Sequence, residues 1–251
     1  MPTPFMHIAL AQRLISDAEL PSNIRTLLTA EWGAFLLGGI APDARVSSGM
    51  DRGSTHFFEY GPTINPPPVE AMLSHHPDLK RAALHDNTRA AFVAGYTAHL
   101  TVDAVWSTDL LYPIFVNGGD WAPQPTKFLV LHALLASLDR HDRQLLLPSD
   151  YDKLAVTTPN HWLPFMSDEA LTVWRDTVAS QLAPGAESLT TEILGKRVSL
   201  TAAELTAFID DEAQMNHLTW ANVPPDKLAV VEETMYTETR ATVIAYLDEP
   251  S

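Results

Sequence analysis

The strongest constraint on the fold is a helical spacing of apolar residues that recurs along almost the whole chain. After His7, for example, apolar side chains fall at Ile8, Ala11, Leu14 and Ile15, which places them along one side of a helix. No run of residues alternates between apolar and polar over a length that would require a β-sheet, and no linker is long enough to require two domains. We therefore predict an all-α, single-domain multi-helix bundle over residues 1–251.

Turn and capping signals divide this pattern into segments. A helix opened by Pro21 should end near Gly38, because proline is tolerated in the first turn and glycine favours helix ends. The stretch 44–68 is rich in glycine and proline, which predicts a long loop followed by a helix. Asp86 is expected to cap a helix over about 88–105. Further helices are expected at about 125–143, 168–182, 199–220 and 225–247.

Composition narrows the classes of function. The chain has 31 acidic and 16 Lys or Arg residues, a formal net charge of -15. Nucleic-acid binders draw most of their affinity from basic patches, so this charge argues against a long polyanion as partner. The chain contains no cysteine, which excludes disulfides and thiolate metal sites. Any metal ion would therefore need nitrogen and oxygen ligands.

Targeting signals are not visible in the sequence. The segment from Met1 to His7 has no basic part followed by an apolar part, as a signal peptide would. No stretch approaches the roughly 18 uninterrupted apolar residues of a membrane span. We therefore expect a cytoplasmic protein without a transmembrane segment.

The strongest local feature is the pair His99 and Asp103. The two residues are four apart, so on a helix they lie on one face and can reach the same ion. Gly95, one turn earlier on that face, would leave room for another chain segment or an ion. The flanking residues are apolar, which predicts a central helix. A buried histidine and aspartate need partners, and either a metal ion or a hydrogen-bonded core histidine would satisfy them.

Four segments together resemble the zinc-dependent phospholipase C family, which shares its fold with the P1-type nucleases. The resemblance covers roughly residues 2–110 and depends on the order and spacing of all four segments. They are Met6-His7, Phe35-Leu36-Leu37-Gly38-Gly39-Ile40-Ala41-Pro42-Asp43, Ser54-Thr55-His56-Phe57, and Phe92-Val93-Ala94-Gly95-Tyr96 leading to His99 and Asp103.

The resemblance implies a helical domain of this type with one to three Zn²⁺ ions. The metal-site part would cover about 2–145, and C-terminal helices about 146–251. The residues matching one metal site are Asp43, His56, His99 and Asp103. Asp103 would also bridge to a second site that includes His7. The family completes that second site with its terminal amine, which here would be the amine of Pro2 after removal of Met1.

The third metal site is where this sequence departs from the family. The family has a histidine six residues after the bridging aspartate, but Asp109 stands there. The next helix offers His132 and Asp139, which are seven apart and so share a face, with His141 and Asp142 as further candidates. The alternative is that residues 139–142 form a solvated helix end. A third ion would therefore need Asp109, His132 and Asp139 as its ligands.

The resemblance implies a metal-dependent phosphoester hydrolase, phospholipase C-like, acting through a metal-bound hydroxide. Divalent ions lower the pKa of bound water and neutralise charge on phosphoryl oxygens. Asp43 and Asp103 are the candidate catalytic residues, as anionic ligands that can accept a proton. The expected substrate is a small phosphoester or a phospholipid headgroup. The alternatives are a non-catalytic, metal-stabilised binding protein of the same fold and a single-strand nuclease. The sequence says nothing about oligomeric state.

Overall fold

Helices account for all the regular secondary structure in the computed structural model, which describes residues 2–119 and 121–248. Within those ranges there is no β-strand, so the predicted all-α fold is confirmed. The helices form one compact domain. No helix within the same ranges is both long enough and apolar enough to cross a membrane.

The elements follow the chain in this order: α1 (Pro4–Ser16), α2 (Ser22–Ala30), α3 (Trp32–Ile40), η1 (Ala41–Ala44), α4 (Arg45–Ser48), α5 (Gly53–His56), α6 (Pro68–His75), η2 (Pro77–Leu79), η3 (Arg81–Ala83), α7 (Asn87–Val105), η4 (Trp106–Val116), α8 (Gln124–Leu145), α9 (Pro148–Val156), α10 (Asp168–Leu182), α11 (Thr190–Arg197), α12 (Ala202–Asp210), α13 (Glu212–Gln214), η5 (Met215–Trp220) and α14 (Pro225–Asp248).

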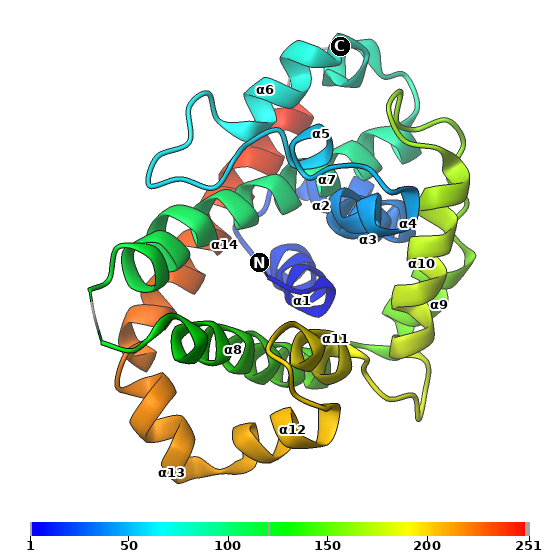
Figure 1. Ribbon diagram of the computed structural model, residues 1–251. Coiled ribbons are helices and arrows are strands. Elements are labelled where there is room, and N and C mark those ends of the chain that lie inside the picture. Colours follow the sequence, from blue (N-terminus) through cyan, green and yellow to red (C-terminus); the bar gives the residue numbers. More distant parts are fainter. Residues whose placement is uncertain (1, 120, 249–251) are drawn as a thin grey trace.

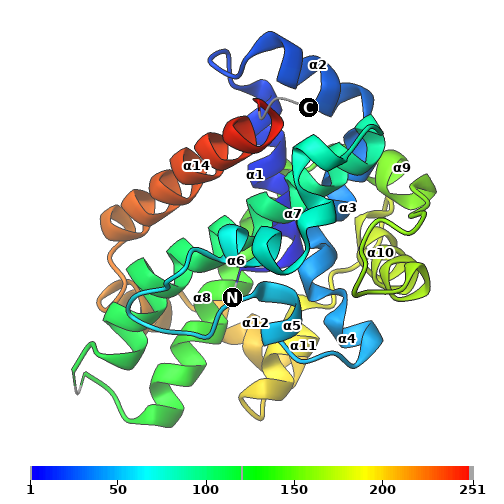
Figure 2. The ribbon, with the colours of Figure 1, turned by 90° about the horizontal axis from the view of Figure 1, so that it is seen from above.

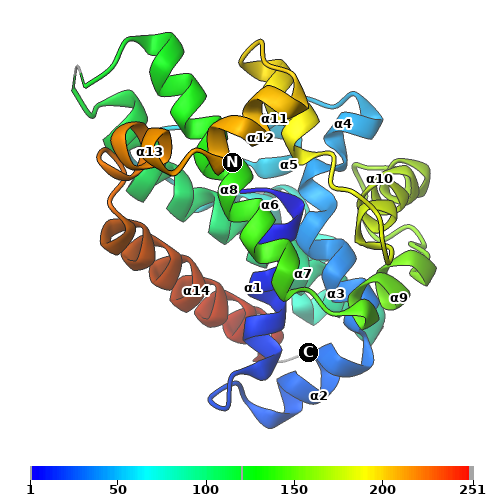
Figure 3. The same cartoon turned by 90° about the horizontal axis from the view of Figure 1, so that it is seen from below.

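Helix α1 runs through the middle of the molecule. In Figure 1 it lies between α3 and α7 on one side and α8 on the other, and it contacts all three. Helix α14 packs along α7 (Figure 2). On the opposite side, α8 supports α11 and α12 (Figure 3). Polar side chains placed near the start of α1 are thus enclosed by helices from both halves of the chain.

Two apolar clusters lie on either side of α1. One is built mainly from α3, α7 and α10, and the other from α8, η4, α12 and α14. Neighbouring α1 residues divide between them, since Ile8 belongs to the first and Met6 to the second, while Leu10 packs against both. His7 lies between Met6 and Ile8 in the sequence and is itself buried. The sequence therefore places a histidine between two apolar cores.

Two glycines allow α3 and α7 to approach closely. A Cβ atom on Gly38 would lie 1.9 Å from the carbonyl oxygen of Phe92, and one on Gly95 would lie 2.2 Å from that of Phe35. Only glycine avoids both clashes without moving a helix. The room that Gly95 was expected to leave is thus taken by the backbone of α3. The Asp86 side chain accepts hydrogen bonds from the backbone N–H groups of Thr88 and Arg89 and caps α7 as predicted.

The sequence pattern missed several interruptions and short helices. The single helix expected from Pro21 is two helices, separated at Glu31, where φ is -104° and ψ is 32°. The helix expected over 199–220 ends at Asp210, because Asp211 instead caps the next short helix through the Gln214 N–H. The expected loop over 44–68 contains α4 and α5, and α9 and α11 were not predicted.

Candidate metal centre

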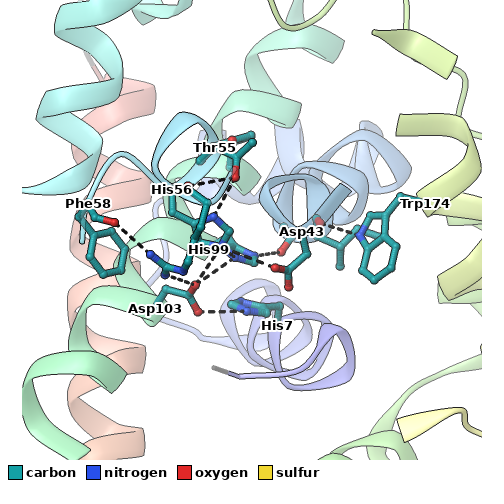
Figure 4. Close-up of polar contacts among 12 residues, drawn as sticks. His7, Asp43, Thr55, His56, Phe58, His99, Asp103 and Trp174 are labelled. Atoms are coloured by element: carbon teal, nitrogen blue, oxygen red, sulfur yellow. Dashed lines mark hydrogen bonds and ion pairs between the residues drawn. The ribbon is translucent and has the colours of Figure 1, made fainter. Parts of the chain in front are cut away.

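Four separate elements bring five of the predicted ligands together. His7 comes from α1, Asp43 from η1, His56 from the end of α5, and His99 and Asp103 from α7. Figure 4 shows these side chains pointing toward one another. All except Asp43 are buried, and Asp43 has 22% of its side chain exposed. The centre therefore has an enclosed interior and one carboxylate at its edge.

Asp103 contacts all three histidines. Its Oδ2 lies 3.2 Å from His56 Nε2 and 3.4 Å from His99 Nε2, and its Oδ1 lies 3.7 Å from His7 Nε2. The His7 and His99 rings stack with centroids 3.9 Å apart. On the far side, His56 Nε2 lies 3.6 Å from Asp43 Oδ1. The predicted i, i+4 pair on α7 thus forms the middle of the cluster.

Hydrogen bonds behind His99 and His56 fix which ring nitrogen of each faces the centre. His99 Nδ1 donates to the Gly39 carbonyl oxygen at 2.8 Å, a contact that requires the close packing of α3 and α7. His56 Nδ1 lies 2.9 Å from Thr55 Oγ1, and the Thr55 carbonyl accepts a hydrogen bond from the Tyr96 hydroxyl. Metal-bound histidines are commonly held in this way through the ring nitrogen that does not bind the ion.

Burial and charge act differently on the four buried groups. Burial disfavours ionisation of Asp103, but the charge of His99 and hydrogen bonds from His56 and His99 hold its pKa well below the usual range. Burial also opposes protonation of His99, yet Asp103 outweighs this and raises its pKa. Burial lowers the pKa of His56, and burial together with His99 lowers that of His7 far below its usual value. Neutral imidazoles are the form that binds metal ions.

The arrangement fits a metal ion. Two buried atoms, His7 Nε2 and Asp103 Oδ1, face each other without any hydrogen-bond partner. Leaving such atoms unpaired costs about 1–3 kcal/mol each, and an ion bound between them would satisfy both. Ligand atoms around one tetrahedral ion lie roughly 3.3–3.6 Å apart. Three pairs of candidate ligand atoms have similar separations here, namely 3.4 Å for His99 and Asp103, 3.6 Å for Asp43 and His56, and 3.7 Å for His7 and Asp103.

Two overlapping groups of three residues could each hold an ion. One is His7, His99 and Asp103, and the other is Asp43, His56 and His99. They share His99, whereas the resemblance implied that Asp103 would be the bridge. Asp103 nevertheless faces both groups, with Oδ1 toward His7 and Oδ2 toward His56 and His99.

The structure does not bring the three predicted third-site residues into either group. Asp109 lies on η4 with its side chain exposed, and it accepts a hydrogen bond from Thr108. His132 is buried on α8 and bonds through Nδ1 to the Phe128 carbonyl oxygen at 2.7 Å. Asp139 is also buried, so it is not part of a solvated helix end, and its Oδ1 has no hydrogen-bond partner. Burial raises the pKa of Asp139 to about 6.

Pro2 is the last of the predicted metal ligands. It is buried and lines the same cavity as Asp43 and His132. Met1, whose removal would free the amine of Pro2, lies outside the described residues. The amine of Pro2 as a metal ligand therefore stays a prediction.

Arg52 is the residue of the centre that the sequence did not reveal. Its Nη2 lies 3.3 Å from Asp103 Oδ2, and its Nη1 donates to the Phe58 carbonyl oxygen at 3.0 Å. The guanidinium also lies over the rings of Phe58 and Tyr60. Arg52 precedes His56 by four residues, a spacing that would have placed both on one side of a short helix. It adds a fixed positive charge to the centre.

Comparisons with known proteins add no family assignment. No protein-family model, curated protein or solved structure matched the chain.

Proposed function

We propose that this protein binds divalent metal ions, zinc first among them, at the two His/Asp groups and hydrolyses small phosphoesters. The observation that carries the proposal is the pair of buried, unpaired atoms, His7 Nε2 and Asp103 Oδ1, 3.7 Å apart. Imidazole and carboxylate ligands together suit zinc, although manganese and iron use the same types of ligand. The resemblance described above supplies the phosphoester chemistry.

The residues around the centre suit this reaction. When bound, divalent ions lower the pKa of a water ligand toward neutrality and offset negative charge on phosphoryl oxygens. Asp43 is half-buried and lines the adjacent cavity, so it can accept a proton from the attacking water. Arg52 lines the same cavity beside Asp103 and can donate hydrogen bonds to a phosphoryl oxygen. Asp43 and Arg52 therefore both lie between the buried centre and the adjacent cavity.

Metal content per chain tests the first half of the proposal. Tag-free protein should carry stoichiometric metal, and His99→Ala should lose it, because His99 belongs to both groups. His217→Ala is the control, since that histidine is exposed and distant in sequence. With zinc added, the wild type should hydrolyse bis(p-nitrophenyl) phosphate, and Asp43→Asn should abolish turnover with an unchanged circular dichroism spectrum. Absence of stoichiometric metal in the wild type would overturn the proposal.

A non-catalytic, metal-stabilised binding protein is the second candidate. It is favoured by the exposure of Asp109 and by the position of His132 and Asp139 outside both groups. Stoichiometric metal without turnover of the generic diester would select this candidate. Cleavage of a single-stranded oligonucleotide would instead select a nuclease, against which the net charge of -15 argues.

A further inference from the structure

A cavity opens directly beside the centre, with Asp43 and Arg52 in its wall and a volume of about 400 Å³. Four large apolar side chains that are exposed to solvent converge on it: Val46, Tyr60, Phe128 and Ile193, with exposures of 58, 40, 47 and 44%. They come from four different segments of the chain. Single exposed apolar residues need no explanation, but several around one hollow mark a surface that binds an apolar group.

Positive charge gathers in the same wall. Three of the 16 Lys and Arg residues, namely Arg45, Arg52 and Arg197, line the cavity, where Asp43 is the sole acidic residue among the described lining residues. This local excess of positive charge contrasts with the net charge of -15. An electropositive hollow in an acidic chain attracts anions selectively.

Two of these arginines have no carboxylate partner. Within residues 2–119 and 121–248, neither Arg45 nor Arg197 forms an ion pair, whereas Arg52 pairs with Asp103. The Nε of Arg45 is buried and has no hydrogen-bond partner. Arg45 is partly buried, and Arg197 is exposed to solvent. A guanidinium that lines a largely apolar cavity without a counter-charge is well suited to bind a carboxylate or phosphate from a ligand.

We propose that the cavity binds an amphiphilic anion, with an alkyl or aryl group against the apolar wall and a negatively charged group held by Arg45 and Arg197. The catalytic meaning of this site rests on the proposed hydrolase function. In that case the substrate would carry a negatively charged group in addition to the phosphoester that is cleaved. A zwitterionic or cationic headgroup would leave the two guanidiniums unpaired and would bring a positive charge toward them. The site therefore selects for anionic headgroups.

Calorimetric titration of the full chain with octyl phosphate tests the binding site, first on the protein as purified and then with chelator present. Binding should be at least about tenfold tighter than that of octylphosphocholine, which has the same tail. Arg45→Gln and Arg197→Gln should each weaken octyl phosphate binding about tenfold. Arg140→Gln is the matched control, because Arg140 forms an exposed ion pair with Asp210. Phe128→Ala should weaken octyl phosphate binding but not that of inorganic phosphate.

The two proposals fail separately. Equal binding of octyl phosphate and octylphosphocholine, or unchanged binding in both arginine variants, would overturn the anion site whatever the metal content. Arginine-dependent binding that survives chelation would support the anion site even if the protein held no metal and showed no turnover. Circular dichroism of each variant checks that a loss of binding reflects the missing guanidinium and not an unfolded chain.

Discussion

Replacing Gly95 with alanine should separate the packing of α3 and α7 from the chemistry of the centre. The new Cβ would lie 2.2 Å from the Phe35 carbonyl oxygen and 2.8 Å from the Gly39 nitrogen. An ordinary contact needs 3.4 Å or more, so the two helices must move apart by about 1 Å. Both obstructing atoms belong to backbone and cannot rotate away.

The expected cost lies at the upper end of the range for overpacked cores, about 3 kcal/mol. For a chain of this size that corresponds to a fall in melting temperature of about 6–12 °C. The shift also pulls the Gly39 carbonyl away from His99 Nδ1, where it now accepts a hydrogen bond at 2.8 Å. Loss of such a supporting contact weakens metal binding about 10- to 100-fold.

Thermal denaturation and zinc titration of Gly95→Ala measure the two effects. Gly39→Ala is the matched control on the opposing helix, because a Cβ at Gly39 would meet nothing within 4 Å. That variant should be as stable as the wild type or slightly more stable, since alanine favours helix over glycine by about 1 kcal/mol. Wild-type stability and zinc affinity in Gly95→Ala would refute the argument that this glycine sets the position of His99.

Two further predictions concern buried carboxylates outside the centre. Burial raises the pKa of Asp139 to about 6, whereas the unfolded chain releases this proton near pH 4. The folded state therefore loses stability as the pH rises from about 4 to about 6. Asp139→Asn should be more stable than the wild type at pH 7, by up to about 3 kcal/mol in urea denaturation, and no more stable at pH 4. Asp150 accepts hydrogen bonds from Trp32 Nε1 and the Leu147 N–H, so Asp150→Ala should destabilise the fold by about 2–4 kcal/mol. Asp152 is exposed, so Asp152→Ala should change stability by less than about 0.5 kcal/mol. Equal effects of the two substitutions would contradict the role assigned to Asp150.

Local signals in the sequence were sufficient for the long central helices. Helix α7 combines a continuous apolar pattern with the Asp86 cap, and both signals act within a few residues of each other. The break at Glu31 has no such signal, because the helical spacing of apolar residues continues across it, from Ile24, Leu27 and Leu28 to Trp32, Phe35 and Leu36. Similarly, Asp211 ends one helix by capping the next. Where the chain turns between two apolar segments depends on tertiary packing, which the spacing of residues does not record.

The candidate ligands were predictable to different degrees for the same reason. His99 and Asp103 are related by helix geometry alone, and the structure keeps them 3.4 Å apart. Asp109 depends on how the chain continues after α7, and it continues as the π-helix η4, which presents Asp109 to solvent. Arg52 reaches Asp103 only because α5 is folded back over α7. Contacts between distant segments can be predicted only once the fold is known, whereas contacts within one helix follow from helix geometry.

The polar side chains of the centre reduce the stability of the fold. Four buried polar side chains occupy a position between two apolar clusters, where apolar residues would add to stability. Two of their atoms lack partners, at about 1–3 kcal/mol each. A chain selected for stability alone would be expected to replace these polar side chains with apolar ones of similar size. Their presence beside a cavity lined by three arginines is the energetic argument for the proposed ligand site.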